Sequence, residues 1–261
     1  MIVSIFPMYM CNLKCPFCYL KGTVCSDILN ATDLEFILSK INVHQINIYG
    51  GEVTLLEEHY INNLLDICSN YTKSISINSN YTFNKIPNWI NRVSLGTSID
   101  FSCRPVNKII NNGRNIYKVF NKKTNILFTD PNNIAYIDRI QEIVDENWVH
   151  SFRILPCVKT KNNKVVLNFK NTENLIYKYY YHNKYDRINV KEECVFISPK
   201  AELLYIAYDN DVEYFSTKST TNNRHCLLCE YYNKCFNEHP FYYTDNYDCI
   251  GFKKLCKKLH L

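Results

Sequence analysis

The chain has 261 residues, 46% of them apolar, which is enough to bury a core as one large domain with or without a small appendage. Its 30 basic and 25 acidic residues give a formal net charge of +5, too small an excess to indicate a nucleic-acid-binding protein. No uninterrupted apolar run of about 18 residues occurs, so no membrane span is predicted.

The first predicted element is a short apolar strand at residues 2–6, which leads into a group of cysteines. Cys11, Cys15 and Cys18 have the spacing Cys-x3-Cys-x2-Cys, with the aromatic Phe17 before the last of them. Three thiolates can hold three corners of an iron–sulfur cube and leave the fourth iron open to a small molecule. A zinc knuckle is the alternative, although zinc sites usually pair two Cys-x2-Cys arms or include histidine.

Strand-like and helix-like segments then alternate along the chain. The six predicted strands are residues 2–6, 45–49, 73–78, 92–100, 124–129 and 151–156. The predicted helices are one that starts at the capping box Thr32-Asp33-Leu34-Glu35 and carries Leu34, Ile37, Leu38 and Ile41, one at residues 57–69, and one at 136–146. Six βα units are too few for a closed eight-stranded barrel, so the prediction is an α/β fold, an open, partial (β/α)6 TIM-type barrel.

Polar and glycine residues stand where three of these strands end, which is where barrels of this type place their chemistry. Gly50-Gly51-Glu52 follows the second strand, and two of the chain's six glycines are adjacent there. Glycine allows unusual backbone angles and the close approach of a ligand. Asn78 ends the third predicted strand, and Ser98 and Asp100 end the fourth.

The cysteine run with its aromatic residue, followed by Gly-Gly-Glu, resembles the signature of radical S-adenosylmethionine (radical SAM) enzymes. The resemblance implies a [4Fe–4S] cluster on the three cysteines, whose open iron chelates the methionine part of SAM and whose electron cleaves SAM to a 5′-deoxyadenosyl radical. Val53 departs from the family pattern, in which proline usually follows the motif. The implied SAM contacts are Phe17 at the adenine, Gly50, Gly51 and Glu52 at the amino group, and Asn78, Ser98 and Asp100 at the ribose or carboxylate.

A second group of cysteines has the spacing Cys226-x2-Cys229-x5-Cys235 and resembles the core of the SPASM domain, a C-terminal module of radical SAM enzymes that modify peptides. The resemblance implies an auxiliary [4Fe–4S] cluster on these three residues and Cys249, with Cys256 or Cys194 as alternative fourth ligands. A structural zinc site on the same cysteines is the competing interpretation.

The module is expected to be a smaller version of the SPASM domain, with one auxiliary cluster instead of two. Ala201 and Ile206 stand where the module's first hairpin normally has glycine and cysteine. We therefore predict a barrel with a helical exit segment at residues 1–186 and a small C-terminal iron–sulfur module at 187–261. The tyrosine-rich stretch 168–186 is predicted to be helical and to lead out of the barrel.

The expected reaction is hydrogen abstraction followed by crosslinking or oxidation of a ribosomally made peptide. Dehydrogenation or epimerisation of a small molecule or of a peptide residue is the alternative, and Cys103 and Cys157 are the candidate hydrogen donors past strands four and six. A non-catalytic zinc protein is the alternative of another class. The chain shows no domain before the barrel that grips a leader peptide, which favours a small substrate.

The resemblance also implies an electron donor such as a flavodoxin or ferredoxin. The chain starts without the basic leader and cleavage site of a signal peptide. Because its cysteines cluster at metal-binding spacings and such clusters are oxygen-sensitive, we expect a protein of the reduced cytoplasm, with no nucleic-acid or membrane partner.

Overall fold

The computed structural model describes residues 1–18, 20, 26–129, 136–154, 169–186, 194–209 and 212–216. Six βα-type units follow one another. Their strands are β1 (Ile2–Ile5), β2 (Gln45–Ile48), β3 (Ile75–Asn78), β4 (Ser94–Ile99), β5 (Thr124–Phe128) and β6 (Val149–Ile154). The helices are α1 (Ala31–Leu38), α2 (Glu58–Ser69), α3 (Val106–Phe120), α4 (Ile137–Asp145) and α5 (Phe169–Tyr179), with short 3-10 turns at Val53–Leu55 and Asn88–Arg92.

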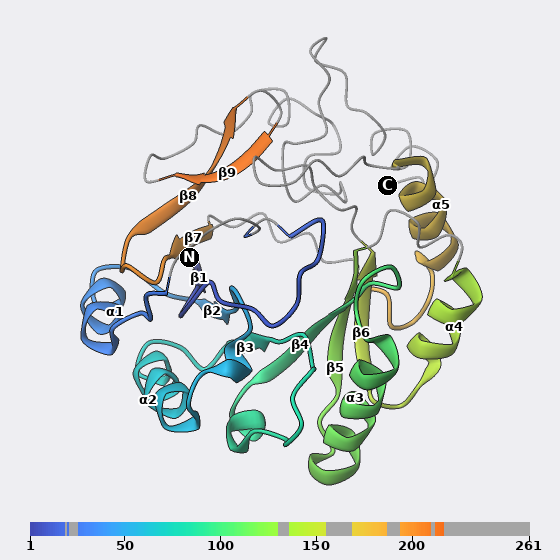
Figure 1. Ribbon diagram of the computed structural model, residues 1–261, viewed down its shortest axis with the longest axis horizontal. Coiled ribbons are helices and arrows are strands. Elements are labelled where there is room, and N and C mark those ends of the chain that lie inside the picture. Colours follow the sequence, from blue (N-terminus) through green and yellow to red (C-terminus); the bar gives the residue numbers. More distant parts are fainter. Residues whose placement is uncertain are drawn as a thin grey trace.

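The strands form a nine-stranded sheet in the order β6-β5-β4-β3-β2-β1-β7-β8-β9. β1 to β6 run parallel, and β7 (Cys194–Ile197) adds a seventh parallel strand on the other side of β1. β8 (Leu203–Asp209) and β9 (Val212–Ser216) complete the sheet as an antiparallel extension. Figure 1 shows the helices following one another around the outer rim of the curved strands. The α/β partial barrel that the sequence predicts is therefore confirmed.

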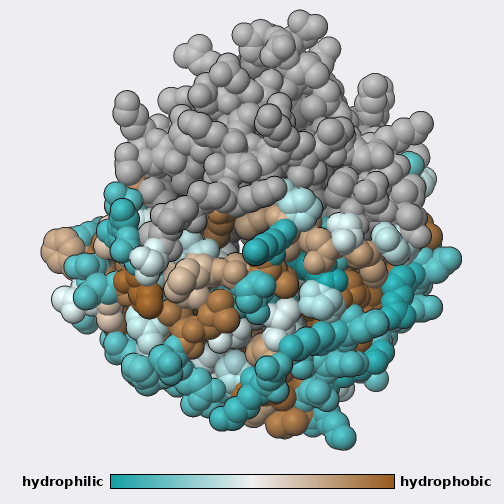
Figure 2. All heavy atoms as spheres, in the orientation of Figure 1, coloured by the Kyte–Doolittle hydropathy of each residue, from teal (hydrophilic) through white to brown (hydrophobic). Residues whose placement is uncertain are grey.

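β2 and β3 alternate a buried isoleucine with a polar residue, so one face of each strand packs into the core, whereas β1 is covered on both faces. All four residues of β1 are buried, and α2 turns Ile61, Leu64, Leu65 and Cys68 into the core. α3 packs so closely that a side chain at Gly113 would lie 2.4 Å from Trp148. Figure 2 shows hydrophilic side chains on the rim of α3 and α4 and apolar ones nearer the middle of this face.

Three details differ from the sequence prediction. The capping box is wrong: α1 is capped by Asn30, whose side chain accepts a hydrogen bond from the Thr32 amide at 2.8 Å, and the helix ends before Ile41. α3 was not predicted, because its apolar residues stand in an asparagine-rich stretch. The exit segment is helical only to Tyr179, after which residues 180–186 turn back along β6, where Phe152 exchanges two backbone hydrogen bonds with Lys184 and Asp186.

Within the described ranges, no helix is both long enough and apolar enough to cross a membrane.

Candidate functional site

The cysteine loop leaves the carboxyl end of β1 and lies inside the ring of helices (Figure 1). A turn closed by the Cys18 amide on the Cys15 carbonyl, at 3.2 Å, brings these two residues together. Cys15 is buried, Cys18 is half-buried and Cys11 is exposed, and all three are free thiols. The loop thus presents one deep and two more open sulfur atoms at the edge of the sheet that the sequence predicts for the site.

The Cys11 and Cys18 thiols lie close enough to Cys15 to respond to its charge. Burial raises the pKa of Cys11 and of Cys18, and the charge of Cys15 raises both further. Among the described residues no three His, Cys, Asp or Glu side chains are placed to hold one metal ion. Three cysteine thiols on one loop are the donor type that an iron–sulfur cube uses, so these residues fit such a cluster.

The two glycines after β2 make room for the backbone that carries the cysteines. Gly50 has a φ of +134°, and a side chain there would lie 2.6 Å from the Met8 carbonyl oxygen. A side chain on Gly51 would lie 1.8 Å from the Met10 carbonyl oxygen. The amides of Gly51 and Glu52 donate to these same two carbonyls, at 3.0 and 2.8 Å. The pair therefore permits close approach of the chain's own residues 8–10, which fixes the start of the cysteine loop.

Glu52 is buried, and its carboxylate is fully occupied by the protein. One oxygen accepts from the Thr54 amide at 3.0 Å, the Thr54 hydroxyl at 2.6 Å and the Ser79 hydroxyl at 2.7 Å. The other oxygen accepts from the Asn80 amide at 2.6 Å. The side chain thus ties the end of β2 to the segment after β3, and its contribution is to hold these segments together.

Asn80 holds the cysteine loop from the side, a role that the sequence analysis missed. Its side-chain amide donates to the side-chain oxygen Oδ1 of Asn12 at 2.8 Å and approaches the Cys11 sulfur at 3.8 Å. Its own oxygen accepts from the Thr82 hydroxyl at 2.6 Å, and Asn12 donates to that hydroxyl at 2.8 Å. The only available signal was its place in the polar run after the third strand.

Asn78 and Ser98 lie at the ends of their strands, as the sequence predicts. Asn78 is exposed, and its side chain lies over Gly96 of β4, where an added side-chain carbon would be 1.8 Å from the Asn78 oxygen. Ser98 is half-buried, and its carbonyl accepts from Arg104 at 3.3 Å. The glycine in β4 therefore leaves the space that the Asn78 amide occupies.

Asp100 is completely buried at the end of β4, but the described residues satisfy only one of its oxygens. Oδ1 accepts from the Ser102 amide at 2.9 Å, the Ser102 hydroxyl at 2.6 Å and the Cys103 amide at 3.1 Å. Oδ2 accepts no hydrogen bond from any described residue, and neither does the buried Nε of Arg104 find an acceptor. A buried acceptor and a buried donor left over beside the cysteine loop fit a polar ligand such as SAM.

The remaining predicted residues divide into those the structure places and those it does not. Phe17 is half-buried within the cysteine loop. The thiol of Cys103 lies beside Cys15 and Asp100, and its pKa is raised by burial and by the charge of Asp100. Cys157, Cys226, Cys229, Cys235, Cys249 and Cys256 lie outside the described residues, and Cys194 opens β7.

No protein-family model matches the chain, and neither does any curated protein sequence. Solved structures do match it. SuiB of Streptococcus suis bound to S-adenosylmethionine is 17% identical, with a TM-score of 0.65 over 92% of this chain and 73% of SuiB. SuiB bound to its precursor peptide SuiA is 18% identical, with a TM-score of 0.65 over 92% and 72% of the two chains. anSMEcpe with bound AdoMet and Cp18Cys peptide is 14% identical, with a TM-score of 0.61 over 100% and 95%.

At these identities the similarity establishes the fold. The class is an α/β partial barrel with a cysteine loop at the carboxyl edge of its first strand. Its architecture is that of the SuiB and anSMEcpe structures, which is the fold that the sequence predicts.

Proposed function

We propose that the protein is a radical SAM enzyme that modifies a ribosomally made peptide. The observation that carries this proposal is the meeting of the three-cysteine loop with Asp100, a buried carboxylate that keeps one oxygen for a ligand. The fold supports the proposal, because the matched SuiB and anSMEcpe structures hold S-adenosylmethionine.

Cys11, Cys15 and Cys18 are the proposed ligands of a [4Fe–4S] cluster. When bound, the cluster and SAM together supply the electron and the radical that removes a hydrogen atom from the substrate. Cluster binding needs these residues as thiolates, and burial, which raises the pKa of Cys11 and of Cys18, opposes that ionisation. Gly50 and Gly51 set the loop's position, and Glu52 fixes the neighbouring turn.

The proposed SAM contacts are Phe17, the Gly50–Glu52 backbone, Asn78, Ser98 and Asp100. The unused Oδ2 of Asp100 is an acceptor suited to a hydroxyl or ammonium group. The Asn78 amide can donate or accept, and its exposure leaves it available to a ligand. These residues orient the cofactor and keep water from the buried end of the site.

A peptide substrate is favoured because two of the matched structures carry peptides, SuiA on SuiB and Cp18Cys on anSMEcpe. We further propose one auxiliary cluster on Cys226, Cys229, Cys235 and Cys249 within a C-terminal module at residues 187–261, and a flavodoxin or ferredoxin as electron donor. Cys157 remains the candidate hydrogen donor outside the described residues. Cys103 is the other candidate hydrogen donor, and its thiol lies beside Cys15.

The test is SAM cleavage by anaerobically reconstituted, dithionite-reduced protein, with 5′-deoxyadenosine measured by liquid chromatography and mass spectrometry. Wild type should bind about eight irons, and the triple alanine variant of Cys11, Cys15 and Cys18 about four. Cys15→Ala should abolish 5′-deoxyadenosine formation. Cys68→Ala is the matched control, since Cys68 is another buried cysteine, on the face of α2 that packs into the core.

The proposal would be refuted if the Cys15→Ala protein still cleaved SAM. It would also be refuted if a fully loaded and reduced wild type formed no 5′-deoxyadenosine with any peptide offered. Zinc at the C-terminal cysteines in reconstituted samples would favour a structural metal site there. A small-molecule dehydrogenase would instead transfer deuterium from a labelled sugar or nucleoside into 5′-deoxyadenosine.

A further inference from the structure

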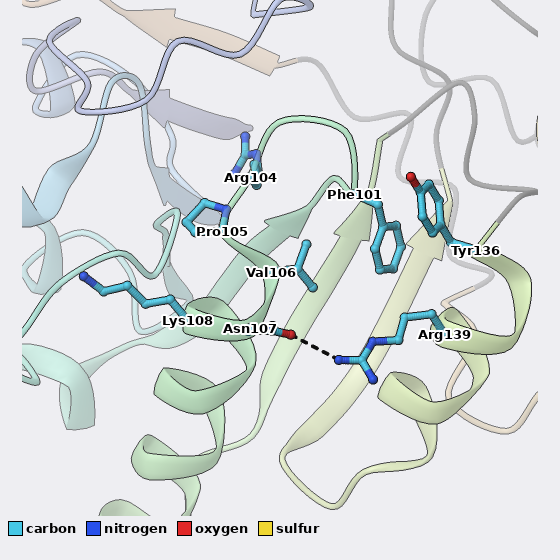
Figure 3. Close-up of a pocket in the computed structure, with 8 residues that line it drawn as sticks. All are labelled: Phe101, Arg104, Pro105, Val106, Asn107, Lys108, Tyr136 and Arg139. Atoms are coloured by element: carbon cyan, nitrogen blue, oxygen red, sulfur yellow. Dashed lines mark hydrogen bonds between the residues drawn. The ribbon is translucent and has the colours of Figure 1, made fainter.

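A pocket of about 410 Å³ opens where the N-termini of α3 and α4 meet, beside the end of β4 (Figure 3). Phe101 and Tyr136 form one wall, with their rings stacked at 4.5 Å between centroids. Tyr136 keeps 38% of its surface exposed, so the ring pair offers an apolar platform at the protein surface. None of the proposed contacts to SAM accounts for this pocket.

The charged residues that line the pocket are all cationic: Arg104, Lys108 and Arg139. Arg139 bonds Glu142 at 2.8 Å and the Asn107 side chain at 3.2 Å, and Figure 3 shows it reaching from α4 toward α3. Lys108 donates to the Asn84 side chain at 2.8 Å. No carboxylate of the described residues pairs with Lys108 or Arg104, so the pocket has an excess of positive charge.

The backbone adds to this positive potential. α3 begins at Val106 with no side-chain cap and no acidic residue in its first turn. α4 begins at Ile137, also without a side-chain cap, although Asp138 in its first turn offsets part of the positive potential there. At the start of α3 the Val106 amide donates to the Arg104 carbonyl at 2.8 Å, and the positive end of this helix dipole supplements the cationic side chains.

The pocket adjoins the candidate active site through Arg104. This residue lines the pocket, its amide donates to the Asp100 carbonyl at 3.2 Å, and its Nη1 donates to the Ser98 carbonyl at 3.3 Å. Its Nε is buried and has no acceptor among the described residues. A peptide that reaches Asp100 therefore lies next to the pocket.

We propose that this pocket binds an acidic side chain of the peptide substrate, with the neighbouring apolar or aromatic residue of that peptide on the Phe101–Tyr136 ring pair. The inference rests on the proposed peptide-modifying function and adds a sequence preference to it. A carboxylate suits Arg139, because each of its terminal nitrogens carries a second hydrogen besides the one donated to Glu142 or Asn107, and the neighbouring cations Arg104 and Lys108 add to the attraction. The ring platform distinguishes a peptide from an inorganic anion, which has nothing to place against it.

The experiment measures fluorescence anisotropy of labelled peptides with the reconstituted full-length protein at low salt. The probe is a seven-residue glycine–serine peptide with two glutamates around a phenylalanine, and its counterpart carries glutamines. We expect the acidic probe to bind at least about tenfold more tightly, and to weaken as salt screens the charges. Arg139→Gln should weaken it about tenfold, whereas Arg114→Gln, which also removes an arginine paired with a glutamate, should not.

Tyr136→Ala tests the ring platform, with Tyr181→Ala as its control because Tyr181 is 71% exposed and does not line the pocket. Equal binding of the acidic and glutamine probes, or equal effects of Arg139→Gln and Arg114→Gln, would overturn the inference. So would inorganic phosphate that displaces the probe at equal concentration, since the site would then take any anion. SAM cleavage is measured on the same wild-type sample: its loss defeats the proposed function, whereas intact cleavage without peptide selectivity defeats only this inference.

Discussion

Two buried carboxylates lie at the carboxyl edge of the sheet, Glu52 after β2 and Asp100 after β4. Glu52 accepts four hydrogen bonds through both oxygens, all from its own chain. Asp100 accepts three, all through Oδ1, and its Oδ2 has no partner among the described residues. The region around Glu52 is therefore held together by its own hydrogen bonds, whereas the region around Asp100 has an unused buried acceptor, where we propose that a ligand binds.

The largest effect should follow from breaking the region around Glu52. Glu52→Ala leaves four donors at the ends of β2 and β3 without their acceptor, so we expect a loss of about 3 kcal/mol in the free energy of unfolding. Urea unfolding measures it. Glu57→Ala, at an exposed glutamate five residues along, should change stability by no more than about 0.5 kcal/mol. Similar losses for both variants would mean that Glu52 does not hold the site.

Asp100→Asn should lower SAM affinity more than it lowers stability. The asparagine oxygen can keep the three hydrogen bonds of Oδ1, while the unused oxygen becomes an NH2 donor. We expect stability to change by less than about 1 kcal/mol and SAM affinity of the reconstituted protein to fall about tenfold. Equilibrium dialysis under anaerobic conditions checks it. Unchanged SAM affinity would remove Asp100 from the ligand site.

Alkaline pH should lower the stability of the protein through Tyr81, a buried tyrosine of the region around Glu52. Burial raises the pKa of Tyr81, whose hydroxyl lies 3.0 Å from the Thr124 hydroxyl. Above about pH 10 the unfolded chain loses a tyrosine proton that the folded chain keeps, so the stability contributed by this tyrosine falls as pH rises. Tyr81→Phe should cost about 1 kcal/mol near pH 8, and its deficit should shrink at about pH 10.5. A deficit that does not change with pH would contradict this.

The smallest effect should come from Gly96→Ala, on the side of the site that meets the ligand. The added carbon would lie 1.8 Å from the Asn78 oxygen, and the Asn78 side chain must rotate away. We expect SAM affinity to fall about threefold, because one contact is displaced and the rest remain. Gly113→Ala, which crowds Trp148 beneath α3, should reduce stability but leave SAM affinity unchanged.

Local patterns predicted six strands and the position of the cysteine loop because these depend on apolar runs and fixed spacings. They did not predict β7, since its parallel pairing with β1 joins residues 194–197 with residues 2–5. The sequence predicts Glu52 as a SAM contact, but it could not show that Ser79 and Asn80, after another strand, donate to its carboxylate together with Thr54. Arg104 and Asn80 were missed for the same reason: their importance depends on neighbours that only the folded chain brings together.

The position of β1 has a consequence for how the protein is made. β1 lies between β2 and β7, and the amide of Phe6, at the start of the cysteine loop, donates to the Ile197 carbonyl at 2.9 Å. During synthesis this edge of β1 stays open until residue 197 of 261 has left the ribosome. A chain truncated before β7 should therefore expose an apolar strand edge and aggregate. The cysteine loop is therefore synthesised early but supported only after β7 has formed, so we expect the proposed cluster to be inserted after translation.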